Sequence, residues 1–364
     1  MAGLIYEALK KEGFSPKKVG QSRSRPNVIV HYGKSRFRKS LVFNGHMDTV
    51  IPTKSYKTNP FSGSVRGNKM YGLGVLDMKA SLSAYVFALK AIKDLDLDLC
   101  GRLTAQFVVD EEPGGCSDFG TKHLLSKDSR YKAAIVAEPG PQIGIGHRGG
   151  YRFKITTFGE AVHTGVSAWQ KKERGRNAVS DMMQLVKLLE KLEIPHKNSK
   201  VFPGKKPMLT FPTLIEGGSA INIVPDKCVA YGDVRLMPGN SNRQIRMLIE
   251  EKLSKIDGVK YKLEDLLYAP AVEIDKEEEI VRFLVDGYKK VTKKPPHVEG
   301  IGPWNDAWMF HEHGIPAVTQ VPIKGGGSHE SQEWVDLTSV KRLTEILVRV
   351  AVSYLCSDGN SLTS

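Results

Sequence analysis

The chain has 364 residues, of which 40% are hydrophobic and 26% are charged, and these proportions are typical of globular proteins. They exclude a mostly disordered chain, collagen and a coiled coil, and the length suggests two domains or one large domain with an insertion. The formal net charge is +13, but the basic residues are spread along the chain without interleaved aromatic residues. We therefore expect a solvated basic surface and no binding to nucleic acid.

Four cysteines, at positions 100, 116, 228 and 356, are scattered and form no CxxC pair. Their spacing argues against a disulfide framework and against a thiolate zinc site. No apolar run approaches the roughly 18–20 residues that a membrane-spanning helix needs. The first residues, MAGLIYEALKKEGF, indicate part of an amphipathic helix rather than a signal peptide. We therefore expect a cytoplasmic protein with reduced thiols and no membrane association.

Short apolar runs alternate along the chain with segments of helical period, which favours an α/β architecture. In chain order, the predicted elements are a strand at 40–43, a helix at 79–95, strands at 103–109, 133–136 and 151–158, a helix near 177–193, strands at 207–215 and 228–236, and helices near 241–256, 275–291 and 337–355. The pattern of the middle indicates a small α+β layer inserted into a larger domain. We therefore expect a first part of the larger domain at residues 1–147, the inserted domain at 148–263, and the second part of the larger domain at 264–364.

The candidate site residues stand at the ends of predicted strands, where side chains can converge outside the carboxyl edge of a sheet. His46 and Asp48 in NGHMDTV point the same way at the end of one strand. A metal-binding imidazole commonly needs a carboxylate on its other nitrogen, although such a pair taken alone is more often structural. Asp77, in YGLGVLDMKA, is either a cap on the dipole of the next helix or a carboxylate that bridges two cations.

Further acids follow two other strands. Asp110, Glu111 and Glu112 end an apolar strand in VVDEEPGG, where three acids repel one another unless cations or solvent compensate. Glu111 and Glu112 project differently, so one can bind a metal while the other stays free as a base; alternatively, the segment is an acidic solvated turn. Glu138 follows the buried strand in AAIVAEPG, where a carboxylate without a partner is unusual. His329 lies in the glycine loop GGGSHESQEW, in which an exposed loop histidine is the alternative.

Together, these residues form a set of two histidines and several acids without a thiolate. Such a set suits a dinuclear site for Zn²⁺, Co²⁺ or Mn²⁺. Two ions about 3.5–4 Å apart can share a water molecule and polarise a carbonyl group. Glu111 would then take the proton of that water as a general base.

Five motifs, NGHMDTV, YGLGVLDMKA, VVDEEPGG, VAEPG and GGGSHESQE, resemble in their order those of a known enzyme family. It is the co-catalytic zinc family that includes succinyl-diaminopimelate desuccinylase, acetylornithine deacetylase, aminoacylase and carboxypeptidase G. The resemblance covers nearly the whole chain. It implies an α/β fold with a phosphorylase/hydrolase-like catalytic domain, in which helices flank a mixed central sheet. It also implies an inserted α+β ferredoxin-like lid and dimerisation domain.

The resemblance implies roles for the strand-end residues. Asp48 looks like the orienting partner of His46, and Glu111 looks like the base that activates the bridging water and later protonates the leaving amine. Each subunit would hold two divalent metal ions, with Zn²⁺ expected and Co²⁺ or Mn²⁺ as alternatives. The residues that look like the metal ligands are His46, Asp77, Glu112, Glu138 and His329, with Asp77 bridging the two ions.

The inserted domain carries three more residues with implied roles. GEAVHTGVS is similar to the family's lid histidine motif, which would place His163 in the active site of the other subunit of a homodimer, where it stabilises the oxyanion. Asn222 in GGSAINIVPDKC and Arg235 in GDVRLMPG look like contacts to the substrate carboxylate, which the planar fork of arginine can grip with two hydrogen bonds. Without the family, these residues would be a turn histidine, a turn former and a surface charge.

Two segments depart from the family pattern. The lid loop HTGVSAWQKKERGRNA lacks the proline that many relatives carry shortly after the histidine, and GPWNDAWMF replaces a run of small residues. Trp304 and Trp308 would either narrow the pocket or pack in the core.

We therefore expect a cytoplasmic homodimeric metallohydrolase that cleaves the amide bond of a small N-acyl amino acid, as a desuccinylase or an acetylornithine deacetylase does. The alternative is a dipeptidase or carboxypeptidase of the same family that acts on short peptides. The motifs do not distinguish the deacylase activity from the metallopeptidase activity. A catalytically silent binding protein is disfavoured, because the set of acids and histidines is complete.

Overall fold

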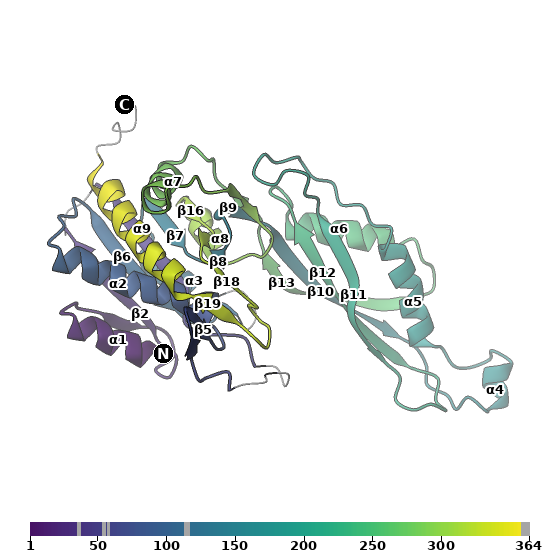
Figure 1. The fold of residues 1–364 in the computed structure, drawn as a ribbon. Helices are drawn as coiled ribbons and strands as arrows, with labels where there is room; N and C mark the ends of the chain where they lie inside the picture. The colour runs from purple at the N-terminus through teal and green to yellow at the C-terminus, as the bar shows by residue number, and fades with distance from the viewer. Residues whose placement is uncertain (35–37, 53–55, 57–58, 113–116, 358–364) are drawn as a thin grey trace. The chain divides into compact units, whose positions relative to one another are not determined.

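The structure is a computed structural model that describes residues 1–34, 38–52, 56, 59–112 and 117–357. Residues 113–115 of the acidic motif, together with Cys116, lie outside these ranges. The chain folds into two compact units, Met1–His147 with Val272–Ser364, and Arg148–Ala271 (Figure 1). Within the described ranges, no helix has both the length and the apolar character that crossing a membrane requires.

The first unit is built on a six-stranded mixed sheet. In spatial order its strands are β1 (Lys17–Val19), β2 (Asn27–Gly33), β6 (Arg102–Val108), β3 (Ser40–His46), β7 (Ala133–Val136) and β16 (Ala317–Val318). The pairs β1–β2 and β2–β6 are antiparallel, whereas β6, β3, β7 and β16 run parallel. Every residue of β3 and β7 is buried, as expected for parallel strands that are covered on both faces. The carboxyl ends of four strands therefore meet at one edge of this sheet.

Helices flank this sheet on both faces. They are α1 (Ala2–Lys11), α2 (Ala80–Asp94), α3 (Thr121–Lys127), α7 (Glu279–Thr292), α8 (Ala307–Glu312) and α9 (Leu337–Cys356). Because side chains alternate along a strand, Phe43 and Asn44 of β3 face opposite ways. Phe43 stacks on Tyr85 of α2 with ring centroids 5.2 Å apart, and the amide of Asn44 donates a hydrogen bond to Thr121 of α3. The long helix α9 packs against α2 and α7 (Figure 1).

Three smaller sheets complete the first unit. Their strands are β14 (Val272–Glu273), β9 (Ile143–His147) and β15 (Val298–Ile301) in one sheet, β17 (Val321–Pro322) and β8 (Pro139–Gly140) in another, and β18 (Gly325–Gly326), β19 (Trp334–Asp336), β5 (Lys69–Tyr71) and β4 (Ser64–Arg66) in the third. The third sheet bears on the site, because it sets Tyr71 of β5 opposite Trp334 of β19.

The second unit contains a four-stranded antiparallel sheet. In spatial order its strands are β11 (Met208–Gly217), β12 (Lys227–Leu236), β10 (Gly149–Phe158) and β13 (Lys260–Ala269), and its helices are α4 (Ser167–Gln170), α5 (Ala178–Leu189) and α6 (Asn242–Leu253). With the one-turn α4 set aside, the chain order is strand, helix, strand, strand, helix, strand, which is the ferredoxin-like arrangement. β13 continues past residue 263, and its pairing with β10 keeps it in this unit.

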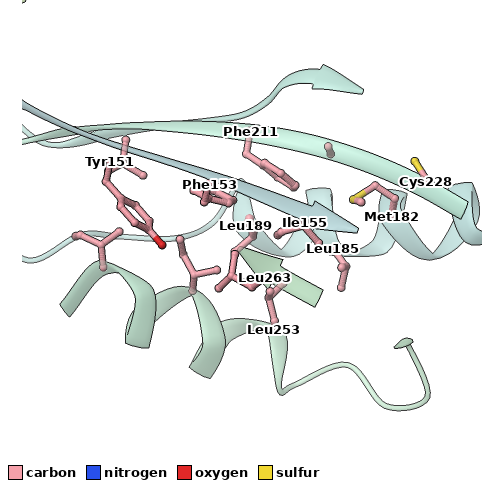
Figure 2. Packing of buried hydrophobic residues seen from close by; sticks show 14 of the residues in the cluster. Tyr151, Phe153, Ile155, Met182, Leu185, Leu189, Phe211, Cys228, Leu253 and Leu263 are labelled. Atoms are coloured by element: carbon pink, nitrogen blue, oxygen red, sulfur yellow. The ribbon is translucent and has the colours of Figure 1, made fainter. Parts of the chain in front are cut away.

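The core of the second unit lies between one face of its sheet and the helices α5 and α6. Figure 2 shows Tyr151, Phe153 and Phe211 from the sheet packed near aliphatic side chains of the helices. Both helices begin at a capping residue. Asn177 accepts hydrogen bonds from two amides of the first turn of α5, and Ser241 accepts one from the first turn of α6, as polar side chains at this position usually do.

Candidate metal centre

The acidic and histidine side chains singled out in the sequence gather at the carboxyl edge of the parallel strands. β3 ends at His46, β6 is followed by Glu112, and β7 is followed by Glu138. Asp77 comes from the turn before α2, and His329 comes from the segment between β18 and β19. Segments that are far apart in the sequence therefore meet where parallel strands end, which is where α/β proteins commonly place their ligands.

Five of these side chains form two groups that could each hold a metal ion: His46, Asp77 and Glu138 in the first, and Asp77, Glu112 and His329 in the second. In the first group, Nε2 of His46 lies 3.2 Å from Oδ1 of Asp77 and 3.6 Å from Oε1 of Glu138. In the second, Nε2 of His329 lies 3.3 Å from Oδ2 of Asp77 and 3.0 Å from Oε1 of Glu112. Asp77 thus gives one carboxylate oxygen to each group, as a bridging ligand does.

His46 is oriented by the residues that follow its strand. Its Nδ1 lies 3.0 Å from the main-chain carbonyl oxygen of Asp48 and 3.8 Å from Oδ1 of the same residue. An Nδ1–H group that donates to this carbonyl leaves Nε2 free to bind a cation. The other carboxylate oxygen of Asp48 accepts a hydrogen bond from the amide of Glu112 at 3.2 Å. The nearer partner of the ring is therefore a main-chain oxygen, whereas the sequence suggested the carboxylate.

Asp77 lies in a tight turn that its neighbouring glycines allow. Gly74 has a φ of 72°, and a Cβ atom at this position would come within 2.4 Å of the Thr49 methyl group. Only glycine adopts this backbone readily in so little space. α2 begins at Ala80 with Lys79 as its N-cap, so Asp77 does not cap that helix. Asp77 is therefore not the N-cap of α2, and its carboxylate faces His46 and His329.

The electrostatics of the cluster show an excess of negative charge. Hydrogen bonds with Asp77 and Glu112 raise the pKa of His329 to about 10. Burial opposes protonation of His46, but its hydrogen bond with Asp77 and the charge of Glu138 raise its pKa well above the usual value. Burial is the main cause that also raises the pKa of Glu138. Buried carboxylates crowded in this way require either protons or cations to compensate them.

The donor set fits two divalent ions. Three carboxylates and two neutral imidazoles carry three negative charges, which offset most of the charge of two such ions. Nitrogen and oxygen donors without a thiolate suit Zn²⁺, Co²⁺ and Mn²⁺. In addition, Oδ1 of Asp48 is buried and has no hydrogen-bond partner among the described residues, as a polar atom beside an ion site would be.

Glu111 belongs to neither group of three. Burial raises the pKa of its carboxyl group well above the usual value; the charge of His46 opposes this shift, and Asp306 and Glu112 add to it. The charges of the cluster therefore act on Glu111, although Glu111 belongs to neither ion group.

Asp306 belongs to the segment GPWNDAWMF, and no role was predicted for it from the sequence. In the structure it lies beside this cluster. It is 4% exposed, and its Oδ2 accepts a hydrogen bond of 2.5 Å from the hydroxyl of Thr121, to which Asn44 also donates. Burial raises the pKa of Asp306 to about 6, and its charge acts on Glu111. Trp308, in the same segment, is 6% exposed, so it packs in the core.

Glu333 was not predicted at all. It is 1% exposed, and its carboxylate accepts hydrogen bonds from the amides of Gly74, Leu76 and Asp77. Burial raises its pKa, while these hydrogen bonds oppose that shift. The sequence offers only a weak signal, an acid four residues after His329 in a polar loop, and many exposed loops contain such acids.

The other three candidate residues lie in the second unit. The structure brings His163 and Asn222 together, with Nε2 of the histidine 3.3 Å from Nδ2 of the asparagine, and both residues are exposed. Nδ1 of His163 accepts a hydrogen bond from the amide of Gly165 at 3.0 Å. Arg235 lies on β12, where its Nε donates to Asp233 at 2.8 Å. The roles of these residues toward a substrate stay predictions.

The sequence profile of peptidase family M20/M25/M40 matches residues 42–353. This chain belongs to that family. It is therefore an enzyme, a metal-dependent hydrolase of amide or peptide bonds, and the resemblance inferred from the five motifs is confirmed.

The relatives of this M20 enzyme carry the names of different activities. It is 26% identical over 382 residues to N-formyl-4-amino-5-aminomethyl-2-methylpyrimidine deformylase of Bacillus subtilis, covering 96% of this chain and 87% of that protein. It is also 26% identical over 320 residues to succinyl-diaminopimelate desuccinylase of Nautilia profundicola, and the match covers 85% of this chain and 83% of that protein. The solved structure of the M20 family metallo-carboxypeptidase Sso-CP2 from Sulfolobus solfataricus matches with a TM-score of 0.78 at 18% identity. The match covers 97% of this chain and 93% of that chain, which shows a shared fold.

Proposed function

We propose that this M20 enzyme hydrolyses the amide bond of a small N-acyl amino acid, with two divalent ions held by the two groups that share Asp77. The observation that carries the proposal is this shared carboxylate, which offers one oxygen to each group. Cleavage of a small N-acyl amide is supported by two relatives, one named a deformylase and one a desuccinylase, and the second of these names an N-acyl amino acid. Zn²⁺ is the ion we propose, and Co²⁺ and Mn²⁺ suit the same donors.

Bound ions would supply the Lewis acidity that polarises a carbonyl group and acidifies a water molecule. Glu111 takes a proton from the attacking water as the water oxygen bonds to the carbonyl carbon. It then gives this proton to the leaving nitrogen as the carbon–nitrogen bond breaks. The products are a carboxylic acid and an amine, and Glu111 regains its starting state. Glu111 is a member of neither ion group, which supports this role, and nearby cations would lower its raised pKa toward the range in which a base acts.

The remaining residues of the proposal come from the second unit, through which we propose that the enzyme forms a homodimer. His163 steadies the oxyanion in the partner's site, while Asn222 and Arg235 hold the substrate carboxylate. The contact between the exposed side chains of His163 and Asn222 supports a joint role in binding. We also propose that the enzyme acts in the cytoplasm.

The test is the substitution Glu111→Gln, which keeps the size of the side chain and removes the base. We expect kcat to fall by about 10²–10⁴-fold on the best of a set of N-succinyl, N-acetyl and N-formyl amino acids. The zinc content per subunit should stay the same. Glu330→Gln is the matched control, because Glu330 is exposed and its side chain makes no hydrogen bond or ion pair among the described residues.

The outcomes separate the parts of the proposal. Loss of zinc from the Glu111→Gln variant would make Glu111 a ligand, and unchanged turnover would remove it from the mechanism. Hydrolysis of dipeptides, with no activity on N-acyl amino acids, would replace the substrate class by that of a peptidase. Inactivity of the zinc-loaded protein on every amide would refute the function itself.

A further inference from the structure

The carboxylate of Glu333 lies buried beneath the turn that carries Asp77. Oε2 accepts a hydrogen bond from the amide of Gly74 at 2.7 Å, and Oε1 accepts two, from Leu76 at 2.8 Å and from Asp77 at 2.9 Å. The side chain is 1% exposed, and no arginine or lysine of the described chain forms an ion pair with it. Its bonding partners are therefore three main-chain N–H groups of one turn.

The pairing of two strands explains how Glu333 reaches this position. β5 and β19 are antiparallel, with Tyr71 opposite Trp334. Glu333 precedes Trp334, and its carbonyl oxygen accepts a hydrogen bond from the amide of Gly72 at 3.2 Å. Because β5 leads directly into the turn that holds Asp77, this register places the carboxylate beside the amides of that turn.

The chemistry of the contact calls for a carboxylate. The three N–H groups point toward one buried place, and an unpaired buried amide costs about 1–3 kcal/mol. A carboxylate brings two acceptor oxygens, and hydrogen bonds to a charged acceptor are stronger than neutral ones. A buried carboxylate is itself unfavourable unless such donors compensate it. A neutral amide side chain would offer one acceptor and would turn its own N–H₂ group toward one of the three donors.

We infer that Glu333 is a positioning residue of the metal centre: it fixes the main chain of the turn so that Asp77 presents one oxygen to each ion. This inference rests on the proposed function. Glu333 also lies four residues after His329, so one loop provides a side chain of the second group and holds the residue that both groups share. Loss of its carboxylate should therefore weaken both ion sites together, whereas a ligand that serves one group affects that group alone.

The experiment measures binding of Zn²⁺ and Co²⁺ to the metal-free full-length protein by calorimetry, together with the visible absorption of the Co²⁺ form. For Glu333→Gln we expect both affinities to fall by about 10–100-fold, as is typical when a partner of a metal ligand is removed. We also expect a changed Co²⁺ spectrum, because the geometry at Asp77 changes. Glu330→Gln, three residues earlier in the same loop, removes the same charge and should behave like the wild-type protein.

A second variant keeps the test decisive if Glu333→Gln does not fold, as judged by circular dichroism of the metal-free protein. Glu333→Asp retains the charge and both oxygens but is one methylene shorter, so we expect it to bind both ions with intermediate affinity. Wild-type affinities and an unchanged spectrum in folded Glu333→Gln, or in Glu333→Asp where the glutamine variant does not fold, would overturn the inference. Failure of the wild-type protein itself to bind two ions would instead refute the proposed function.

Discussion

Tyr85 links β3 and β7, the neighbouring strands at whose ends His46 and Glu138 of the first ion group stand. Its buried hydroxyl accepts a hydrogen bond from the amide of Ala137 at 2.9 Å and donates one to the carbonyl of Asn44 at 2.8 Å. Asn44 stands two residues before His46 in β3, and Ala137 immediately precedes Glu138 after β7. A single hydroxyl therefore connects the strand ends from which two side chains of the group project.

The substitution Tyr85→Phe removes this oxygen and keeps the ring that stacks on Phe43. It leaves the buried amide of Ala137 without its acceptor, which costs about 1–3 kcal/mol, and it also removes a hydrogen bond worth about 0.5–1.5 kcal/mol. Because these two costs overlap in part, we expect the free energy of unfolding to fall by about 2–3 kcal/mol. For a unit of this size, the Tm should fall by about 4–12 °C.

Urea unfolding and calorimetry of the metal-free protein measure this change, and the transition assigned to the first unit is the one to compare. Tyr32→Phe is the matched control, because the hydroxyl of Tyr32 makes no hydrogen bond among the described residues. A loss of less than about 0.5 kcal/mol for Tyr85→Phe, equal to that of the control, would refute the reasoning, since such a value is within the ordinary range of surface substitutions.

Two further predictions concern histidines. The side chain of His329 is 52% exposed and that of His46 is 2% exposed, so a chelator should remove the ion of the second group first. The variant His329→Ala should retain one zinc ion per subunit but lose turnover. A zinc content of two ions per subunit in this variant would contradict the assignment. Burial lowers the pKa of His311 below its usual 6.5, so the folded state favours the neutral ring. This preference contributes to the free energy of unfolding above about pH 6.5, and the contribution is lost as the pH falls toward the lowered pKa. Each tenfold difference in the proton affinity of the ring between the folded and unfolded states is worth about 1.4 kcal/mol. His311→Gln should flatten this part of the profile of unfolding free energy against pH, and an unchanged slope would exclude His311 as the cause.

The regular elements could be predicted where their hydrophobic period extends over enough residues. β7 has the predicted bounds, and α2 begins and ends within one residue of the predicted helix. α7 begins at Glu279, later than predicted, because residues 275–278 form a turn in which Asp275 accepts a hydrogen bond from the amide of Glu277. The two-residue strands β8, β17 and β18 were not predicted, since two residues carry no period and their pairing depends on distant segments.

His46, Glu112 and Glu138 could be singled out because acids and histidines at the ends of apolar strands are unusual without a partner. Asp77 and His329 lie in glycine-rich segments, and the resemblance to the family marked them as ligands. Glu333 and Asp306 could not be found in this way. Both look like polar residues of loops or helix starts, and both are buried in the structure. Their burial follows from long-range features, the register of β5 with β19 for Glu333 and the contact with Thr121 for Asp306, which no local pattern encodes.

The two ion groups depend on supports of different kinds. His46 ends β3 and Glu138 follows β7, the neighbouring strands that the hydroxyl of Tyr85 connects, whereas His329 belongs to a loop. Asp77 is common to both groups, and its turn is bonded to Glu333 in the loop of His329. A displacement of that loop would therefore move a side chain of the second group directly and, through Glu333, the shared carboxylate of the first. The two groups are for this reason coupled through the loop, and a change in the conformation of the loop should alter the affinity of both ion sites together.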